Sequence, residues 1–364
     1  MLEKDMKRFF IVVSTLVGMA IAISACNPSP TQAPTEIVEE EVIVEETEEP
    51  VEFEPMLIFE LPHDDKVKSV AYSHDGTLFA TGSFAKINLW NSLDGNLVNS
   101  LEPITSDVED LAFSPDDQMI GGGFLNGQVE FYNVTNGEVS QNFNIGNNSR
   151  LAISPDGEWI ATISGVKSAA SLWSLSDGEL VFELDPASAT DGYSKWASAI
   201  TFSPDGQLIA IGHWDGTVFI WRTDDGTLST ILEPETDFCS AWGLDFSADS
   251  RYLAVNGAKV DFNDMVRIWD LEDSSIAQNL EVTKGGASLN SSPVDFSPDG
   301  KLLAAGTAAG IYLWSLPDFD LINLLPIEQS DQTDWVTDLD FSPDSRHLLA
   351  GYWHGYAQLW RVQP

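Results

Sequence analysis

Positive charge is scarce in this sequence: 17 lysine and arginine residues face 57 aspartate and glutamate residues, and the formal net charge is −40. A surface of this sign repels nucleic-acid phosphates and anionic lipid headgroups unless basic residues gather locally. The densest basic cluster is Lys4, Lys7 and Arg8, and it falls in a segment that we interpret below as removed. We therefore expect no nucleic-acid partner.

Residues suited to catalysis are also few, with two cysteines and five histidines in 364 residues. If Cys26 is lipidated, Cys239 has no intramolecular partner, so we expect no disulfide and interpret Cys239 as a structural thiol. No P-loop, His-Glu-x-x-His motif, nucleophile elbow or Cys-x-x-Cys pair occurs. The sequence thus predicts a protein that is not an enzyme and has no cofactor.

One acidic segment raises the question of a metal. Asp261, Asn263 and Asp264 carry oxygen ligands that could bind Ca²⁺. Their spacing lacks the glycine and the terminal glutamate of an EF-hand loop. A solvated loop is therefore the favoured interpretation, and we expect no metal site.

Long hydrophobic runs are absent too, because the longest, Phe9 to Ile23, is too short to span a bilayer comfortably. It follows a basic start and precedes small residues, as in a secretory signal. The following Ile23-Ser24-Ala25-Cys26 resembles the bacterial lipobox. We expect residues 1–25 to be a lipoprotein signal peptide and Cys26 to carry the lipid that anchors an extracytoplasmic protein to a membrane of the bacterial cell envelope. The alternative is an uncleaved signal anchor.

The next segment, residues 27–55, is acidic and rich in proline. Ten glutamates lie between Glu36 and Glu54, and no lysine or arginine occurs between Arg8 and Lys66. Such a block repels itself and has little apolar surface to bury. We therefore predict that residues 26–55 form the lipidated cysteine and a disordered tether.

Internal repetition dominates the remainder, residues 56–364. Each unit has an apolar strand, a turn built on serine and aspartate, an Ala- and Gly-rich strand, a second turn and a strand that closes on an aromatic residue. The turn aspartates are 40 to 50 residues apart: Asp75, Asp116, Asp156, Asp205, Asp249, Asp299 and Asp344. The closing aromatics are Trp90, Tyr132, Trp173, Trp221, Trp269, Trp314 and Trp360. Two independent markers thus give seven units.

Each part of the repeat has a physical reason. Aspartate bonds to nearby backbone N–H groups, and glycine accepts the positive φ of a tight turn, as in Ser154-Pro155-Asp156-Gly157. Strands such as Leu302 to Gly306 are apolar throughout, which suits burial on both faces. A polar turn and a fourth strand follow each closing aromatic. Four strands per unit at this period predict an all-β, seven-bladed β-propeller with four-stranded antiparallel blades.

Three units, Val67 to Asn91, Ala197 to Arg222 and Val336 to Arg361, resemble WD repeats. The resemblance implies a rigid interaction platform without catalysis. Many WD repeats contain a hydrogen-bonded tetrad of His, Ser or Thr, Asp and Trp, but here only Asp215 occupies the Asp position and only His63 lies near the His position. We therefore expect stability to depend on apolar packing between blades.

The last unit is one strand short, because only four residues follow Trp360 in the sequence. Met56 to Leu61 is an apolar segment that belongs to no other unit. We predict that this N-terminal strand closes the ring as the outer strand of the last blade, which would cover an open sheet edge.

Six aromatic residues are the candidate partner-binding site. Phe84, Trp214 and Trp353 share one position in the second turn, and Trp196, Trp242 and Trp335 lie at or before first strands. In WD-repeat propellers both positions tend to face the top rim. Clustered exposed aromatics indicate a binding patch, and the alternative is packing under neighbouring loops.

The predicted function is a membrane-anchored binding or scaffold module, a monomeric propeller whose top face recruits a protein, a peptide or a glycan. Rings set among carboxylates suit a sugar face or a cationic peptide. The alternatives are an extracytoplasmic propeller hydrolase and an accessory subunit of an envelope enzyme complex. Propeller enzymes usually add a second domain or a cofactor, and neither is visible in the sequence.

Overall fold

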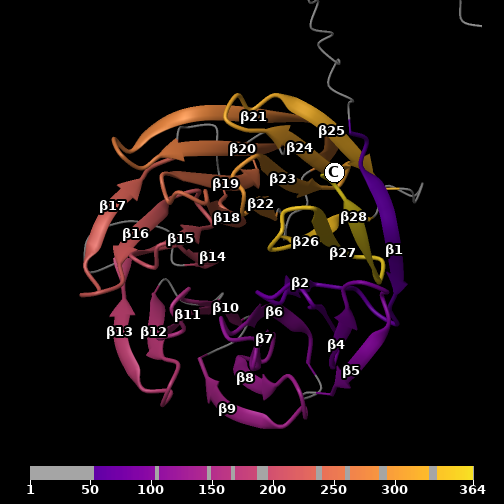
Figure 1. The fold of residues 1–364 in the computed structure, drawn as a ribbon. Coiled ribbons are helices and arrows are strands. Elements are labelled where there is room, and N and C mark those ends of the chain that lie inside the picture. The colour runs from indigo at the N-terminus through magenta and orange to yellow at the C-terminus, as the bar shows by residue number, and fades with distance from the viewer. Residues whose placement is uncertain are drawn as a thin grey trace, which may run out of the picture. The chain divides into compact units, whose positions relative to one another are not determined.

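A computed structural model describes residues 53–102, 106–145, 149–164, 169–186, 196–234, 240–258, 263–286, 293–327 and 334–363. The predicted signal peptide, Cys26, almost all of the predicted tether, Cys239 and Asp261 lie outside them. The described residues form seven four-stranded antiparallel sheets, which surround a common axis as the blades of a ring (Figure 1). The prediction of a seven-bladed propeller is confirmed.

The first four blades follow the chain in order. Blade 1 contains β2 (Ser69–Tyr72), β3 (Leu78–Ser83), β4 (Lys86–Asn91) and β5 (Leu97–Leu101). Blade 2 contains β6 (Val108–Phe113), β7 (Met119–Phe124), β8 (Gln128–Asn133) and β9 (Val139–Asn144). Blade 3 contains β10 (Ser149–Ile153), β11 (Trp159–Ser164), β12 (Ala170–Ser174) and β13 (Leu180–Leu184). Blade 4 contains β14 (Ala197–Phe202), β15 (Leu208–His213), β16 (Val218–Arg222) and β17 (Leu228–Leu232).

The last three blades complete the ring. Blade 5 contains β18 (Gly243–Phe246), β19 (Tyr252–Ala258), β20 (Asn263–Asp270) and β21 (Ser275–Gly286). Blade 6 contains β22 (Val294–Phe296), β23 (Leu302–Thr307), β24 (Gly310–Ser315) and β25 (Leu321–Pro326). Blade 7 combines β26 (Val336–Phe341), β27 (His347–Tyr352) and β28 (Tyr356–Arg361) with β1 (Met56–Pro62). The first strand of each repeat lies nearest the axis (Figure 1).

The serine–aspartate turn is formed in all seven blades. The serine hydroxyl donates to the aspartate two residues later, at 2.5 to 2.8 Å. The same oxygen accepts the backbone N–H five residues later, at 2.8 to 2.9 Å. The turn therefore satisfies its own buried polar groups, which explains why serine and aspartate recur there. We call the end of the ring with these turns the lower face and the opposite end the upper face.

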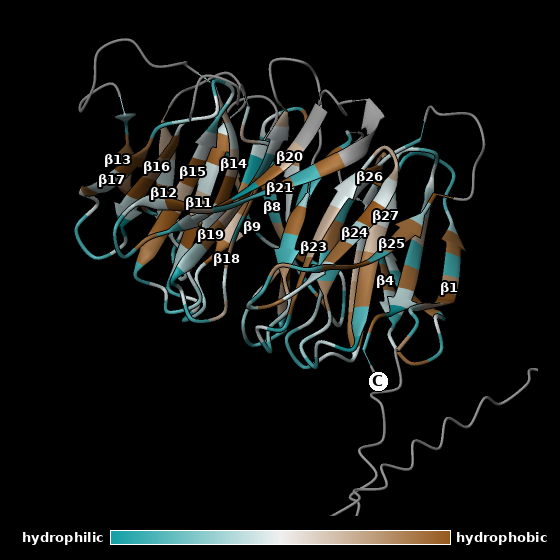
Figure 2. Ribbon diagram, turned by 90° about the horizontal axis from the view of Figure 1, so that it is seen from above, coloured by the Kyte–Doolittle hydropathy of each residue, from teal (hydrophilic) through white to brown (hydrophobic). Residues whose placement is uncertain are grey.

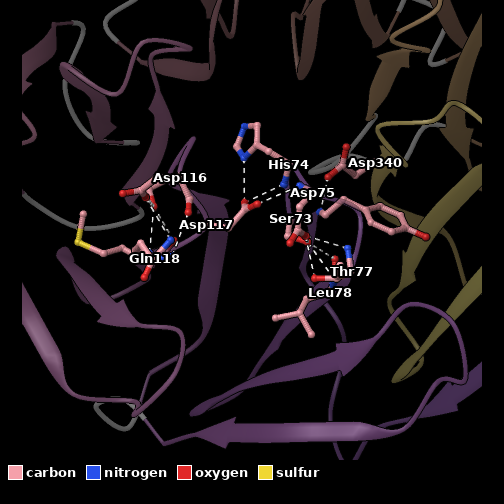
Figure 3. Close-up of polar contacts among 12 residues, drawn as sticks. Ser73, His74, Asp75, Thr77, Leu78, Asp116, Asp117, Gln118 and Asp340 are labelled. Carbon is pink, nitrogen blue, oxygen red and sulfur yellow. Dashed lines mark hydrogen bonds and ion pairs between the residues drawn. The ribbon is translucent and has the colours of Figure 1, made fainter.

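Three turns replace the expected glycine with a residue that reaches the preceding blade. Asp117 has a φ of 56°, and its carboxylate accepts the backbone N–H groups of His74 (2.8 Å) and Asp75 (2.9 Å), as Figure 3 shows. The hydroxyls of Ser250 and Ser345 accept backbone N–H groups in the same way. Hydrogen bonds between blades thus offset the left-handed backbone at these positions.

Apolar contacts join neighbouring blades, as predicted. One cluster packs Ile87 and Leu89 of blade 1 against Val108 and Phe124 of blade 2, and comparable clusters occur around the ring. Figure 2 shows that apolar residues line the strands and hydrophilic residues gather in the turns. The small residues of the second strands permit close approach: a Cβ on Gly82 would lie 2.6 Å from Val108.

The polar tetrad is degenerate, as expected. In blade 1, His63 Nε2 lies 2.7 Å from Thr81 Oγ1, and Trp90 Nε1 donates to the same oxygen at 2.9 Å. In blade 3 the corresponding bond runs from Trp173 Nε1 to Thr162 Oγ1, at 2.8 Å. The closing Trp221, Trp269 and Trp314 are buried between blades. Apolar packing, together with the hydrogen bonds between blades, therefore joins blades that lack a complete tetrad.

Ring closure by the N-terminal strand is confirmed. β1 pairs antiparallel with β28, from Met56 opposite Arg361 to Pro62 opposite Tyr356. Because β28 runs from the upper to the lower face, Met56 lies at the lower face. The described part of the chain contains no helix that could cross a lipid bilayer.

Candidate functional site: a tryptophan-walled pocket

A pocket of about 200 Å³ opens at the upper end of the axis. Its lining comes from six of the seven blades: Lys68, Glu109, Leu125, Arg150, Ser198, Trp214, Trp242, Trp335, Thr337 and Trp353. Four of the six aromatic residues selected from the sequence are in this set. The innermost strands and their neighbouring turns converge at the axis, so residues from distant parts of the chain meet there.

Three tryptophans form one wall. Trp196 precedes β14, Trp214 lies in the turn between β15 and β16, and Trp242 precedes β18. The ring centroids of Trp196 and Trp214 are 5.2 Å apart, and those of Trp214 and Trp242 are 4.7 Å apart, both in edge-to-face geometry. Trp196 remains 47% exposed and Trp214 39% exposed. The wall is therefore held together by its own ring contacts and still faces solvent.

Blade 7 supplies a second wall with the same design. Trp335 and Trp353 stack with centroids 4.5 Å apart at an interplanar angle of 20°. Trp353 donates its backbone N–H to the Trp335 carbonyl at 3.1 Å, as Trp214 does to Trp196. The ammonium group of Lys66 lies 4.9 Å above the Trp353 ring. Because first and second strands pair antiparallel, a tryptophan before the one and a tryptophan after the other become neighbours.

Phe84 is the predicted site residue that does not join this group. It is 48% exposed and lines a separate hollow with Asp64, Asp65 and Lys86. In blade 1 the position of Trp196 and Trp335 is occupied by Lys66, so Phe84 has no tryptophan beside it. The structure thus brings five of the six aromatics together.

The remaining side of the pocket is charged, which the sequence analysis missed. Lys66 and Lys68 contact Asp107 at 3.0 and 2.9 Å, and Lys68 also pairs with Glu109. Burial alone would raise the pKa of Asp107, but the two ammonium groups hold it below its usual value. Lys68 and Glu109 both lie five residues before a turn serine, so the repeat register could have identified them.

Below the pocket, a channel continues along the axis. A smaller cavity of about 120 Å³ shares Arg150, Trp242 and Thr337 with the pocket, and a lower hollow of about 590 Å³ shares Asp110, Ile200 and Asp338 with that cavity. The lower hollow is larger, but its lining repeats residues of the recurrent turns and includes no tryptophan. The upper pocket is therefore the more distinctive site.

Five aspartates of the innermost strands join neighbouring blades, and three of them, Asp110, Asp338 and Asp340, line the channel. The carboxylates of Asp338 and Asp340 accept the backbone N–H groups of Val70 and Tyr72, at 2.8 and 2.6 Å. Asp110, Asp245 and Asp295 bond to the following blade in the same way. Burial raises the pKa of Asp110 to about 7, although Arg150 opposes the shift.

Within the part of the chain that the structure describes, these residues do not form a metal centre. In the described ranges, no group of three or more His, Cys, Asp or Glu side chains is placed to hold a metal ion. Of the acidic segment considered for Ca²⁺, Asn263 and Asp264 belong to β20, and Asp261 lies outside the description. The arrangement at the upper face is suited to binding through aromatic surfaces and a few charged groups.

Two segments of the chain match a known family of repeats. Residues 185–222 and 326–361 match the description "WD domain, G-beta repeat". Two segments of the chain are therefore similar to WD repeats. Residues 51–185 also match the description "Eukaryotic translation initiation factor eIF2A". The WD matches include three of the four strands of blade 4 and three of the four strands of blade 7, the two blades that carry paired tryptophans.

Several curated proteins have sequences similar to parts of this chain. The chain is 28% identical to rat apoptotic protease-activating factor 1 over 206 residues, which is 54% of this chain and 16% of that protein. It is 30% identical to meiotic recombination protein rec14 of Schizosaccharomyces pombe over 207 residues, or 54% and 63% of the two chains. It is 34% identical to the small ribosomal subunit protein RACK1 of Caenorhabditis elegans over 122 residues, or 32% and 35%. The chain thus spans less than two thirds of each relative, and the WD repeats indicate a protein-interaction scaffold.

Proposed function

We propose that this protein is a non-catalytic, membrane-anchored, extracytoplasmic binding module that recruits a protein or peptide to its tryptophan-walled pocket. The observation that carries the proposal is the convergence of Trp196, Trp214, Trp242, Trp335 and Trp353 on one accessible face. Tryptophan is enriched among the residues that dominate binding energy, particularly where several rings line one concave site. A glycan that stacks on the same rings is the second class of ligand to test.

The anchor is the other half of the proposal. It is supported by the lipobox-like Ile23-Ser24-Ala25-Cys26 and by the acidic segment that follows. The described chain reaches the propeller at Met56, on the lower face, whereas the pocket opens on the upper face. A tether attached at Met56 would therefore leave the pocket accessible to a partner beyond the membrane surface.

Replacing the wall residues separates binding from folding. Trp214→Ala, Trp242→Ala and Trp353→Ala should each weaken capture of the native partner from envelope extracts by about 2 kcal/mol or more, as hot-spot truncations do. Because these rings are partly exposed, the cost in unfolding free energy should be about 1 kcal/mol or less. Binding and melting are measured on the same variants.

The matched control is Trp314→Ala, because Trp314 is 3% exposed between blades. It should cost about 3 to 5 kcal/mol of stability without changing the affinity of the folded fraction. If the pocket variants behave like this control, with large losses of stability and unchanged affinity, the site assignment is wrong although the fold stands.

Cys26→Ser tests the anchor. The variant should lose acylation and move from the detergent phase to the aqueous phase, because no other residue would carry the acyl chains. Intact-mass measurement of the wild type should show the mass of a lipidated chain that begins at Cys26. An unlipidated mature wild type would exclude the anchor while leaving the binding proposal intact.

A further inference from the structure

Arg150 lies at the floor of the tryptophan-walled pocket. It belongs to β10 and lines both the pocket and the smaller cavity beneath it. Among the described residues, none forms a hydrogen bond or an ion pair with its guanidinium group. An arginine carries five N–H donors in a rigid planar fork. These donors therefore face a solvent-accessible cavity without a protein acceptor.

The two carboxylates that interact with Arg150 through their charge, Asp110 and Asp338, already accept hydrogen bonds from backbone N–H groups. Asp110 accepts the backbone N–H groups of Leu111 (3.1 Å) and Leu151 (3.0 Å). Asp338 accepts those of Leu339 (3.0 Å) and Val70 (2.8 Å). Both act on Arg150 through their charge, but their oxygens hold neighbouring strands together. The N–H donors of the guanidinium group therefore remain available to another acceptor.

The other cations of the pocket are already paired. Lys66 and Lys68 share Asp107, and Lys68 also contacts Glu109. In a chain with a formal net charge of −40, this makes Arg150 the uncommitted positive group at the described pocket. Indole rings flank the pocket on two sides, and a ligand that displaces water from between them would strengthen a charge-assisted hydrogen bond to Arg150.

We infer that the pocket recognises a carboxylate group of a peptide partner next to an apolar or aromatic side chain. The carboxylate would pair with Arg150, and the apolar group would lie among Trp214, Trp242 and Trp353. A planar carboxylate matches the arginine fork in a two-point contact, which a hydroxyl or an amide reproduces less well. This inference rests on the proposed function and adds the chemistry of the ligand to it.

A pair of small probes tests the carboxylate requirement. N-acetylphenylalanine and N-acetylphenylalanine amide differ only in the carboxylate, and both can be titrated into the full-length chain in detergent and followed by tryptophan fluorescence. We expect the acid to bind about tenfold more tightly than the amide or better, a ratio equivalent to about 1.4 kcal/mol. Arg150→Gln should abolish this preference, and Arg150→Lys should retain part of it.

The matched control is Lys301→Gln, which removes one positive charge from an exposed lysine paired with Asp299 at the lower face. It should leave the preference for the acid unchanged. Equal binding of acid and amide, no binding of the acid, or a preference that survives Arg150→Gln would each overturn the inference. If Trp353→Ala still reduces partner capture in that case, the pocket remains a binding site and only its ligand chemistry is wrong.

Discussion

Deletion of Met56–Leu61 should lower the melting temperature of the propeller by about 10 °C or more. These residues form most of β1, the outer strand of blade 7, which pairs with β28. Leu61 is buried, and Ile58 and Phe59 pack with Trp90 and the blade 7 strands. Loss of this apolar contact, together with the strand pairing, should cost on the order of 5 kcal/mol. Calorimetry of the purified chain measures the change.

The control deletion, residues 27–49, removes a longer segment of the predicted tether and should shift the melting temperature by a degree or two at most. If both deletions have the same effect, closure by β1 contributes nothing specific to stability. Because a shortened chain could misfold, Leu61→Ala provides a milder test. It should cost about 2 to 3 kcal/mol by truncating a buried side chain.

The same closure illustrates what the sequence predicts well. Each turn aspartate bonds within its own turn, so a local pattern of serine, aspartate and glycine was enough to count seven blades and to notice that one outer strand was missing. The aromatic pairs could also be predicted, because Trp196 with Trp214 and Trp335 with Trp353 flank adjacent antiparallel strands of one blade, one residue before the first strand and one residue after the second. In such cases the contacts that define the structure join residues that are close together in the sequence.

Contacts between blades across the axis could not be predicted from the local sequence pattern. Arg150 meets tryptophans of blades 4, 5 and 7 only because the ring closes, and its own repeat contains no feature that marks it as unusual. Phe84 shows that a shared repeat position can also mislead. It occupies the same position as Trp214 and Trp353, but Lys66 occupies the place of the neighbouring tryptophan. A repeat position fixes the height of a side chain in the ring, whereas its neighbours depend on which residues the other blades supply.

We expect the buried aspartates of the innermost strands to give the protein an unusual dependence of stability on pH. Burial raises the pKa of Asp110 to about 7 and that of Asp338 to about 6. Burial also raises the pKa values of Asp295 and Asp340 well above the usual range, and mutual repulsion with neighbouring carboxylates adds to the shift. In the unfolded chain these groups titrate near pH 4. Between about pH 4 and pH 7 the folded protein therefore holds more protons than the unfolded chain.

This difference sets the sign of the effect. Where the folded state binds more protons, the free energy of unfolding falls as pH rises. Turn aspartates such as Asp75 and Asp116 act in the opposite direction: hydrogen bonds from Thr77 hold the pKa of Asp75 below its usual value, and hydrogen bonds from Ser114 and from the Gln118 backbone do the same for Asp116. Their contribution is present above about pH 4 and is lost as pH falls further. Stability should consequently be greatest near pH 4 to 5, below the neutral pH at which many proteins are most stable.

Melting temperatures measured from pH 3 to pH 8 test this expectation. We expect a decrease of several degrees between pH 5 and pH 8 that persists in 0.5 M salt, because salt screens general repulsion among exposed carboxylates but acts weakly on buried ones. Asp110→Asn should flatten the curve between pH 5 and pH 8, since one raised carboxyl is removed. Asp116→Asn should instead destabilise the protein more at pH 7 than at pH 3. A decrease that vanishes in high salt, or an unchanged slope in Asp110→Asn, would assign the pH dependence to surface charge rather than to the channel.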